Sequence, residues 1–366
     1  MLVIIRTDAS QLIGSGHVMR CLVLADALSK SGHEVIFLCR DLPGNCYSII
    51  RERGYLYFLH PYPPCKKQIY ETHLPCDDYS IWLGVSQEED ARETLNFIKN
   101  RNVDLMITDI YGLDISWEKV IKPAVKKLMV IDDLANRLHT CDLLLDHNYY
   151  QNYECRYDGL VPSYCKKLLG PSYALINPKL GQVKKARQAS APSKHIIENV
   201  LVFLGGMDVK NYTEKVLAGI LDSALQQTTV EVVLGKANMH NDGIIEKYSR
   251  YSNIDFHIQP HNYFDLLTRA DLSINAGGVS VLERLFINLP SLIICTAENQ
   301  KQICHALQAD NLGIYVENLA MLPKTINQYI KSSLHIKNAN YLFASNPEQN
   351  LLKEITDEFE NFELPT

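Results

Sequence analysis

Short apolar runs alternate with segments of helical periodicity in the first half of the chain. Runs of strand length lie at 2–5, 35–39, 55–59, 103–108, 128–131 and 142–145, and apolar residues recur at helical spacing at 18–28, 88–100 and 117–127. Strands that alternate with helices at this spacing are typical of a parallel, doubly wound sheet. The pattern therefore predicts an α/β domain.

The alternation stops near the middle of the chain and then restarts. Apolar runs return at 199–204, 229–234, 254–259, 272–275 and 291–295, and helical spacing returns at 212–226, 263–270, 279–286, 302–309 and 348–359. The segment in between contains K-K-A-R-Q-A-S-A-P-S-K, which is polar and basic and predicts an interdomain linker. A chain of 366 residues also exceeds what one hydrophobic core usually serves. We expect a first domain over 1–178, a linker over 179–194, a second domain over 195–345 and a closing helical segment over 346–366.

Glycine-rich turns follow several of the predicted strands. Gly14-Ser15-Gly16 lies between the first strand and the first helix, Gly205-Gly206 follows the strand at 199–204, and Gly277-Gly278 follows the strand at 272–275. Glycine lets a backbone come close to a ligand and turn its N–H groups toward an anion. These turns are therefore candidate phosphate sites, and tight packing turns are the alternative.

His17 opens the first predicted helix. The positive end of a helix favours the neutral imidazole, which can act as a base. Asp8 is close in the sequence, and its carboxylate could orient the ring. A plain surface histidine is the alternative.

Polar side chains also follow three successive predicted strands, where ligands bind to parallel sheets. They are Asp109 and Tyr111, then Asp132-Asp133, then Asn148. Carboxylate pairs can act as acid and base. Aspartate also caps turns and helices, which is the role that we favour for Asp132 or Asp133. Glu283, about one and a half helical turns after Gly278, could reach a ribose diol, and a solvated helix face is the alternative.

The composition narrows the classes of function. The formal net charge of −6 and the pI near 6.1 argue against broad nucleic-acid binding. No apolar run reaches membrane-spanning length and no signal-peptide pattern precedes the first strand, so we expect a cytoplasmic protein without membrane insertion. His60, Cys65, His73 and Cys76 are candidate zinc ligands, but their spacing fits no standard zinc pattern, and we expect no metal. The sequence leaves the oligomeric state open, with a monomer among the possibilities.

Several longer motifs occur in a consistent order between residue 1 and about residue 310. They include R-T-D-A-S-Q-L-I-G-S-G-H-V-M-R-C-L, W-L-G-V-S-Q-E-E-D-A, I-D-D-L-A-N-R-L-H-T-C-D-L-L-L-D-H-N, L-L-G-P-S-Y-A-L, F-L-G-G-M-D and N-A-G-G-V-S-V-L-E-R-L-F. Together they resemble the UDP-2,4-diacetamido-2,4,6-trideoxy-β-L-altropyranose hydrolases of pseudaminic acid biosynthesis. In outline, the second half is also similar to other GT-B nucleotide-sugar enzymes, including the peptidoglycan N-acetylglucosaminyltransferase.

The resemblance implies a GT-B fold, in which two Rossmann-like domains face each other across a cleft and the final helix crosses back onto the first domain. It implies a UDP-linked amino sugar as the partner, held by its UDP on the second domain. It further implies hydrolysis without metal or cofactor, which releases UDP and a free sugar.

The resemblance also assigns roles to residues by position. His17 is the expected base that activates water. By position, the resemblance gives Glu283 and Asn299 as nucleotide-sugar contacts, with Gly277 and Gly278 beside the diphosphate. The residues themselves add further expected substrate contacts, which are Gly14, Gly16, Asp109, Tyr111, Asn148, Gly205, Gly206 and Gln300. The chain departs from the usual family pattern at Ile110, Ser172, Asn177, Lys179 and Met207. A glycosyltransferase with the same UDP site and a non-catalytic nucleotide-sugar binding protein are the alternative functions.

Overall fold

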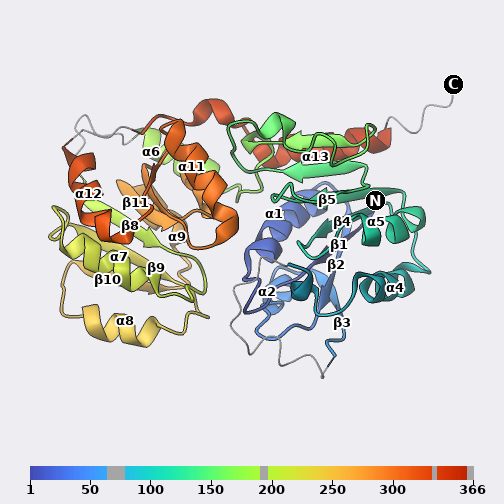
Figure 1. Cartoon of the computed structure of the whole chain (residues 1–366), viewed down its shortest axis with the longest axis horizontal. Coiled ribbons are helices and arrows are strands. Elements are labelled where there is room, and N and C mark those ends of the chain that lie inside the picture. The colour runs from blue at the N-terminus through green and yellow to red at the C-terminus, as the bar shows by residue number, and fades with distance from the viewer. Residues whose placement is uncertain (64–78, 190–196, 332–335, 361–366) are drawn as a thin grey trace. The chain divides into compact units, whose positions relative to one another are not determined.

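The computed structural model describes residues 1–63, 79–189, 197–331 and 336–360 (Figure 1). The chain forms two compact units. Unit 1 comprises Met1–His147, Asn152–Leu175 and Pro347–Thr366, and unit 2 comprises Asn148–Gln151 and Ile176–Asn346. Each unit has its own sheet and its own hydrophobic core.

Unit 1 is built on a seven-stranded parallel sheet. In spatial order its strands are β3 (Leu56–His60), β2 (Glu34–Arg40), β1 (Leu2–Thr7), β4 (Leu105–Asp109), β5 (Lys127–Ile131), β6 (Leu143–Asp146) and β7 (Lys166–Leu169). The strand order reverses between β1 and β4, and ligands bind beyond the carboxyl ends of strands at such a switch point. The register pairs Thr7 with Asp109. The Gly loop after β1 and the last residue of β4 therefore meet at this position.

Helices cover both faces of the unit 1 sheet. One face carries α1 (Gly16–Lys30), α2 (Ser48–Glu52) and α13 (Pro347–Glu360), and the other carries α4 (Gln87–Ile98) and α5 (Ile115–Ile121). Short 3₁₀ turns lie at η2 (Tyr79–Leu83), η3 (Lys122–Ala124), η4 (Tyr153–Cys155) and η5 (Pro171–Tyr173).

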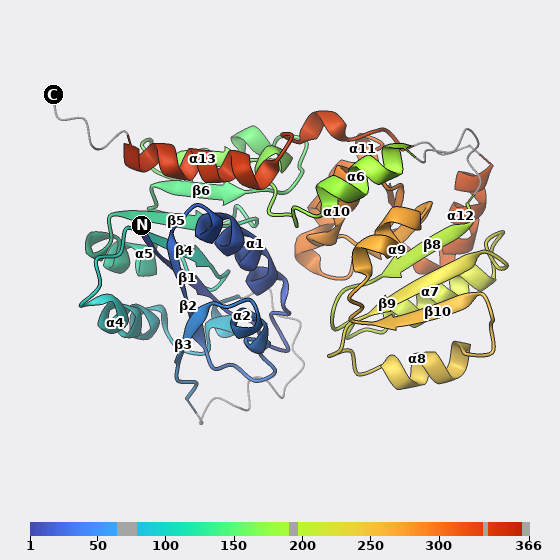
Figure 2. The ribbon, with the colours of Figure 1, turned by 180° about the vertical axis from the view of Figure 1, so that it is seen from behind.

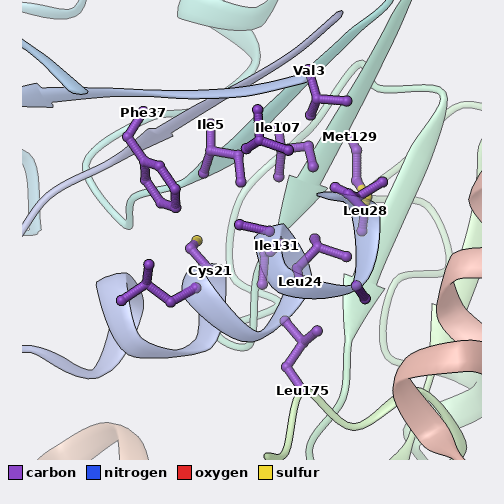
Figure 3. Close-up of a cluster of buried hydrophobic side chains, with 14 of the residues drawn as sticks. Val3, Ile5, Cys21, Leu24, Leu28, Phe37, Ile107, Met129, Ile131 and Leu175 are labelled. Carbon is purple, nitrogen blue, oxygen red and sulfur yellow. The ribbon is translucent and has the colours of Figure 1, made fainter. Parts of the chain in front are cut away.

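The apolar stripe of α1 fixes that helix on the sheet. Ile5, Ile107 and Met129 of three neighbouring strands point toward Leu24 and Leu28 of α1 (Figure 3). All five side chains are fully buried. Burying such a side chain contributes about 1.5–3 kcal/mol. This packing holds the first turn of α1, and with it His17, against the carboxyl end of β4.

The C-terminal helix α13 belongs to unit 1 (Figure 2), where it packs against α1 and the turn η5. Leu351, Leu352 and Ile355 are buried in the same core as α1. Lys166 at the start of β7 forms an ion pair with Glu354 at 2.8 Å. Helix α13 follows unit 2 in the sequence. An apolar stripe and a few ion pairs nevertheless attach it to unit 1.

Unit 2 is built on a six-stranded parallel sheet. In spatial order its strands are β10 (Ile254–Ile258), β9 (Thr229–Leu234), β8 (Asn199–Phe203), β11 (Leu272–Ala276), β12 (Ser291–Ile294) and β13 (Ile314–Tyr315). Its helices are α6 (Leu180–Ala189), α7 (Tyr212–Leu221), α8 (Asn241–Tyr248), α9 (Tyr263–Arg269), α10 (Ser280–Phe286), α11 (Lys301–Ala309) and α12 (Leu322–Ile330), and η6 (Glu298–Gln300), η7 (Leu319–Met321) and η8 (Asn340–Leu342) are short turns. Among the described residues of both units, no helix combines the length and the apolar character that a bilayer crossing demands.

The structure corrects two of the expected elements. The described part of the expected linker, up to Ala189, is largely helix α6, because Leu180 and Val183 are buried and Arg187 donates hydrogen bonds to backbone carbonyls of unit 2. The helix expected over 117–127 ends at Ile121, since a separate 3₁₀ turn that contains Pro123 begins at Lys122 and β5 begins at Lys127. The sequence pattern also missed β7, α8, α12 and β13.

Candidate active site

His17 is paired with a carboxylate of the neighbouring strand. It is the second residue of α1 and is 7% exposed, and its Nδ1 lies 2.6 Å from Oδ1 of Asp109, the last residue of β4. An ionised carboxylate can only accept, so Nδ1 carries the proton and donates it to this bond. The neutral ring then has its lone pair on Nε2, the nitrogen that can take a proton from a ligand or from water.

The expectation that Asp8 orients this ring is wrong. Oδ1 of Asp8 accepts from the guanidinium of Arg6 at 2.6 Å and from the backbone N–H of Arg40 at 2.7 Å. Asp109 takes the role instead, because β4 lies directly beside β1 and its end is level with Thr7. Closeness along the chain therefore misidentified the partner.

Arg20 holds the carboxylate that holds His17. Its Nε and Nη2 donate to the two oxygens of Asp109 at 2.7 and 2.6 Å, and its Nη1 donates to Asp133 at 2.9 Å. Burial opposes ionisation of Asp109, but the charge of Arg20 and the contact with His17 outweigh burial and hold the pKa of that carboxyl well below its usual range. Asp109 is therefore an anion at every physiological pH.

Tyr111 completes this group, which we call the His17 cluster: His17, Arg20, Asp109, Tyr111 and Asp133. The Tyr111 hydroxyl donates a short hydrogen bond to Asp133, and the ring meets the His17 ring edge-on with centroids 4.6 Å apart. Burial and the Asp133 carboxylate raise the pKa of Tyr111 well above its usual value, so it stays a hydrogen-bond donor. The structure thus brings together the predicted residues His17, Asp109 and Tyr111.

The sequence analysis missed Arg20 and did not distinguish the roles of Asp132 and Asp133. Arg20 lies three residues after His17, a spacing that puts both on one face of a helix, and this signal could have identified it. The turn-capping role was expected for Asp132 or Asp133. Asp132 has that role, since its Oδ2 accepts from the N–H of Ala135 at 3.0 Å, whereas Asp133 is bound to Arg20 and Tyr111.

The first glycine loop is shaped by its own backbone. Gly14 has a φ of +77°, in the left-handed region, and its N–H donates to the carbonyl of Ser10 at 2.8 Å. A Cβ on Gly16 would meet no atom within 4 Å. The turn therefore explains Gly14, and open space adjoins Gly16 at the start of α1.

Asn148 was expected to act from the first domain, but the structure groups it with unit 2. The chain leaves unit 1 directly after His147, and Asn148 is 4% exposed. The next residue, Tyr149, donates from its hydroxyl to Asp310, directly after α11, at 2.6 Å. The position of Asn148 after the short strand β6 did not indicate that this residue belongs to unit 2.

In unit 2, the Gly277-Gly278 turn packs closely against the region that follows β12. A Cβ on Gly277 would lie 2.6 Å from Sγ of Cys304, and a Cβ on Gly278 would lie 3.4 Å from Nε2 of Gln300. The N–H of Gly277 donates to the carbonyl of Ile294 at 3.0 Å. Close packing therefore accounts for Gly277, and its N–H already has an acceptor within the protein.

Gln300 is held beside this turn by its own hydrogen bonds. Its Oε1 accepts from the N–H of Thr296 at 2.9 Å and from the Thr296 hydroxyl at 3.1 Å. These bonds point the side-chain amide nitrogen toward Gly278. Asn299, the residue before it, is partly exposed in η6. The structure thus places the predicted residues Gly277, Gly278 and Gln300 together.

The Gly205-Gly206 turn after β8 is also shaped by packing. Gly205 has a φ of +102°, and the Gly206 carbonyl oxygen would lie 1.8 Å from a Cβ on Gly235. Asp208 then caps α7 by accepting from the N–H groups of Tyr212 and Thr213, both at 2.7 Å. The turn leaves the sheet at the carboxyl end of β8, next to β11.

Glu283 lies in α10 with one oxygen fixed by two neighbours. Oε2 accepts from Arg284 Nη1 at 2.8 Å and from the Tyr263 hydroxyl at 3.2 Å. Burial raises the pKa of Glu283, and the positive charge of Arg284 opposes that shift. A carboxylate fixed through one oxygen can offer the other to a pair of hydroxyl groups.

Within the described ranges, no group of three or more His, Cys, Asp or Glu is arranged to hold a metal ion. Of the four candidate zinc ligands, only His60 is described, and its Nε2 lies 3.3 Å from the hydroxyl of Thr94. Burial and the neighbouring Arg6 lower the pKa of His60 to about 3. Cys65, His73 and Cys76 lie outside the described residues.

The chain is similar in sequence to the UDP-2,4-diacetamido-2,4,6-trideoxy-beta-L-altropyranose hydrolase of Campylobacter jejuni. The two are 29% identical over 304 residues, which cover 82% of this chain and 94% of that protein. The expected resemblance to this hydrolase is confirmed. A spore coat polysaccharide biosynthesis protein of Bacillus subtilis, SpsG, is 28% identical over 212 residues, 56% of this chain and 60% of that protein. No protein-family model matches the chain.

Solved structures with the same fold are glycosyltransferases. MurG of Acinetobacter baumannii matches with a TM-score of 0.61 over 98% of this chain and 99% of that chain, and UGT89C1 of Arabidopsis thaliana matches with a TM-score of 0.62 over 99% and 95%. Identities of 13% and 12% make this a likeness of fold alone. The GT-B fold class, with two parallel-sheet α/β domains, is confirmed.

Proposed function

We propose that this protein hydrolyses a UDP-linked 2,4-diacetamido-2,4,6-trideoxy sugar at its anomeric carbon, releasing UDP and the free sugar, as a step of pseudaminic acid biosynthesis. The similarity to the Campylobacter jejuni hydrolase supports the substrate class. The observation that carries the chemistry is the 2.6 Å pair between His17 Nδ1 and Asp109. A buried carboxylate that fixes Nδ1–H leaves Nε2 as a general base.

In the proposed reaction, His17 Nε2 takes a proton from water as the water oxygen attacks C1. The C1–O bond to UDP breaks at the same time, its electron pair goes to the departing diphosphate, and the configuration at C1 inverts. Asp109 stabilises the imidazolium that forms, and Arg20 keeps Asp109 ionised. Such general-base help contributes on the order of 10²–10⁴ in rate.

In the proposed function, unit 2 binds the UDP half of the substrate. Glu283 would accept hydrogen bonds from the ribose diol through the oxygen that Tyr263 and Arg284 leave available. Gly278, Asn299 and Gln300, with the Gly205-Gly206 turn, would surround the diphosphate. We assign sugar contacts to Tyr111 and Asn148, and no step of the mechanism uses a metal.

The proposed function is tested by turnover of UDP-sugars by the full chain in ¹⁸O-labelled water. We expect UDP release with the label on C1 of the free sugar. Label on UDP would mean attack at phosphorus and would rule out the mechanism. UDP release only after addition of an acceptor alcohol would favour a glycosyltransferase, and tight binding without release would favour a non-catalytic binding protein.

A further inference from the structure

Three aromatic side chains form a continuous surface next to His17. Tyr111 meets His17 edge-on, and Trp82 stacks on Tyr111 with ring centroids 5.6 Å apart. Tyr79 lies edge-on to both, 4.7 Å from Trp82 and 5.1 Å from Tyr111. We call Tyr79, Trp82 and Tyr111 the aromatic wall.

Packing fixes the aromatic wall in place. Tyr79 and Trp82 lie in the 3₁₀ turn η2, whose last residue, Leu83, is 1% exposed and anchors the turn in the core. Gly112, directly after Tyr111, lets η2 approach, because a Cβ at this position would lie 2.8 Å from the Tyr79 carbonyl oxygen. The rings therefore have a defined position relative to His17.

The outer part of the aromatic wall lies at the surface. Tyr111 is 6% exposed, whereas Tyr79 and Trp82 are partly exposed. The Tyr111 hydroxyl is bonded to Asp133, so the polar end of this ring belongs to the His17 cluster. Partly exposed aromatic side chains beside a few fixed polar groups are typical of small-molecule sites.

We infer that the aromatic wall binds a methyl group of the sugar and thereby selects the substrate. This inference rests on the proposed function, since the sugar half of the substrate must reach His17. A 2,4-diacetamido-2,4,6-trideoxy sugar has such methyl groups at C6 and on its two acetamido substituents. A methyl group gains from contact with ring faces, whereas a hydroxyl placed there would give up water without a matching partner.

The expected selectivity is moderate. An apolar site discriminates against an added hydroxyl or a missing methyl by about 10–200-fold. We therefore expect the wild-type protein to prefer the trideoxy substrate by a factor in this range over one of two analogues. The first analogue carries a hydroxyl at C6, and the second carries N-formyl in place of N-acetyl groups. The analogue that is discriminated against identifies the methyl group.

The test compares Trp82→Ala and Trp82→Phe with the wild-type chain on all three UDP-sugars. We expect Trp82→Ala to raise KM for the trideoxy substrate and to bring the preference close to one, while kcat changes less. Trp82→Phe keeps a ring and should keep most of the preference. Tyr341→Ala is the matched control, because it removes an aromatic side chain that is 70% exposed in unit 2. Calorimetry with UDP alone should give the same affinity for all four proteins.

Equal kcat/KM values of the wild-type protein for the three UDP-sugars would overturn the inference. An equal loss of kcat/KM for all three in Trp82→Ala would overturn it as well. If Trp82→Ala no longer binds UDP, the comparison of wild type with Trp82→Phe and Trp82→Leu decides. Trp82→Phe keeps an aromatic ring, whereas Trp82→Leu puts an apolar side chain without a ring in its place. Failure of the proposed function is a separate outcome, in which no UDP is released from any sugar. The preference is then measured from the dissociation constants of the intact UDP-sugars.

Discussion

Unit 1 contains two buried histidine–carboxylate pairs of nearly equal geometry. Nδ1 of His17 lies 2.6 Å from Asp109, and Nδ1 of His139 lies 2.6 Å from Glu118. The surroundings of the two rings differ. Nε2 of His139 lies 3.8 Å from a second carboxylate, Asp132, so that anions flank this ring on both sides. His17 instead shares Asp109 with the guanidinium of Arg20 and has the ring of Tyr111 beside it.

This difference separates a structural ion pair from a candidate base. Burial works against a charge on His139, but the negative charges of Asp132 and Glu118, together with the hydrogen bond to Glu118, outweigh burial and raise its pKa to about 9. At neutral pH His139 is therefore a cation inside the protein, with no free lone pair. A short bond between histidine and carboxylate does not by itself make a base, because the second ring nitrogen must also be left without an anionic partner.

The largest effect is expected when the base is removed. His17→Asn should lower kcat by on the order of 10²–10⁴, because no other group of the His17 cluster can take the proton from water. The folded state should persist, with a loss in the free energy of unfolding of at most about 2 kcal/mol. Steady-state UDP release and urea unfolding measure the two effects. His33→Asn, which changes a histidine that precedes β2 at the opposite end of the strands, is the control, and an unchanged kcat in His17→Asn would refute the assignment.

For His139, which is paired with Glu118, we expect a substitution to lower stability and to leave kcat unchanged. His139→Gln should cost about 3–5 kcal/mol of unfolding free energy, because it leaves the buried carboxylates Glu118 and Asp132 without their cation. The kcat of the remaining folded protein should not change. Urea unfolding with a parallel activity assay tests this. His257→Gln, which breaks a partly exposed pair with Glu231, should cost less than about 1 kcal/mol, and a similarly small cost at His139 would contradict our comparison.

The charge on His139 also predicts how stability changes with pH. Its folded-state pKa of about 9 lies above the unfolded value near 6.5, so the folded state binds this proton more tightly. This contribution is fully present below about pH 6.5 and is lost as the pH rises through about 9. It amounts to on the order of 3 kcal/mol. The difference in unfolding free energy between wild type and His139→Gln should therefore shrink from pH 6 to pH 10, and a constant difference would show that His139 is neutral when folded.

The smallest effect is expected from removal of divalent cations. Treatment with a chelator should leave kcat unchanged, because in the proposed function His17 with Asp109 supplies the base and residues of unit 2 bind the diphosphate. Activity assays before and after treatment, with Mg²⁺ added back, measure this. A loss that Mg²⁺ restores would show that the His17 cluster is not sufficient.

The sequence indicated the residues of the candidate site better than it indicated which of their side chains contact one another. The G-S-G-H turn identified His17, and the strand ends identified Asp109 and Tyr111. The partner of His17 was misassigned to Asp8, and the sequence did not show that Asp133 rather than Asp132 joins the His17 cluster. Both points concern side chains that meet through neighbouring strands, about which spacing along the chain carries no information. The same limit applies to Asn148, because nothing in the short strand before it indicates that the chain enters unit 2 there.

The strand–helix alternation, the glycine turns and the chemical type of each site residue could be read from the sequence alone, because burial on a strand or helix follows a local period. Only the tertiary structure decided that β4 lies beside β1, and hence that Asp109, Arg20 and Asp133 converge on His17. It also decided that His139 lies between two carboxylates whereas His17 does not. Whether a histidine is a base or a buried cation depends on the charges packed around it, and strand order sets those charges.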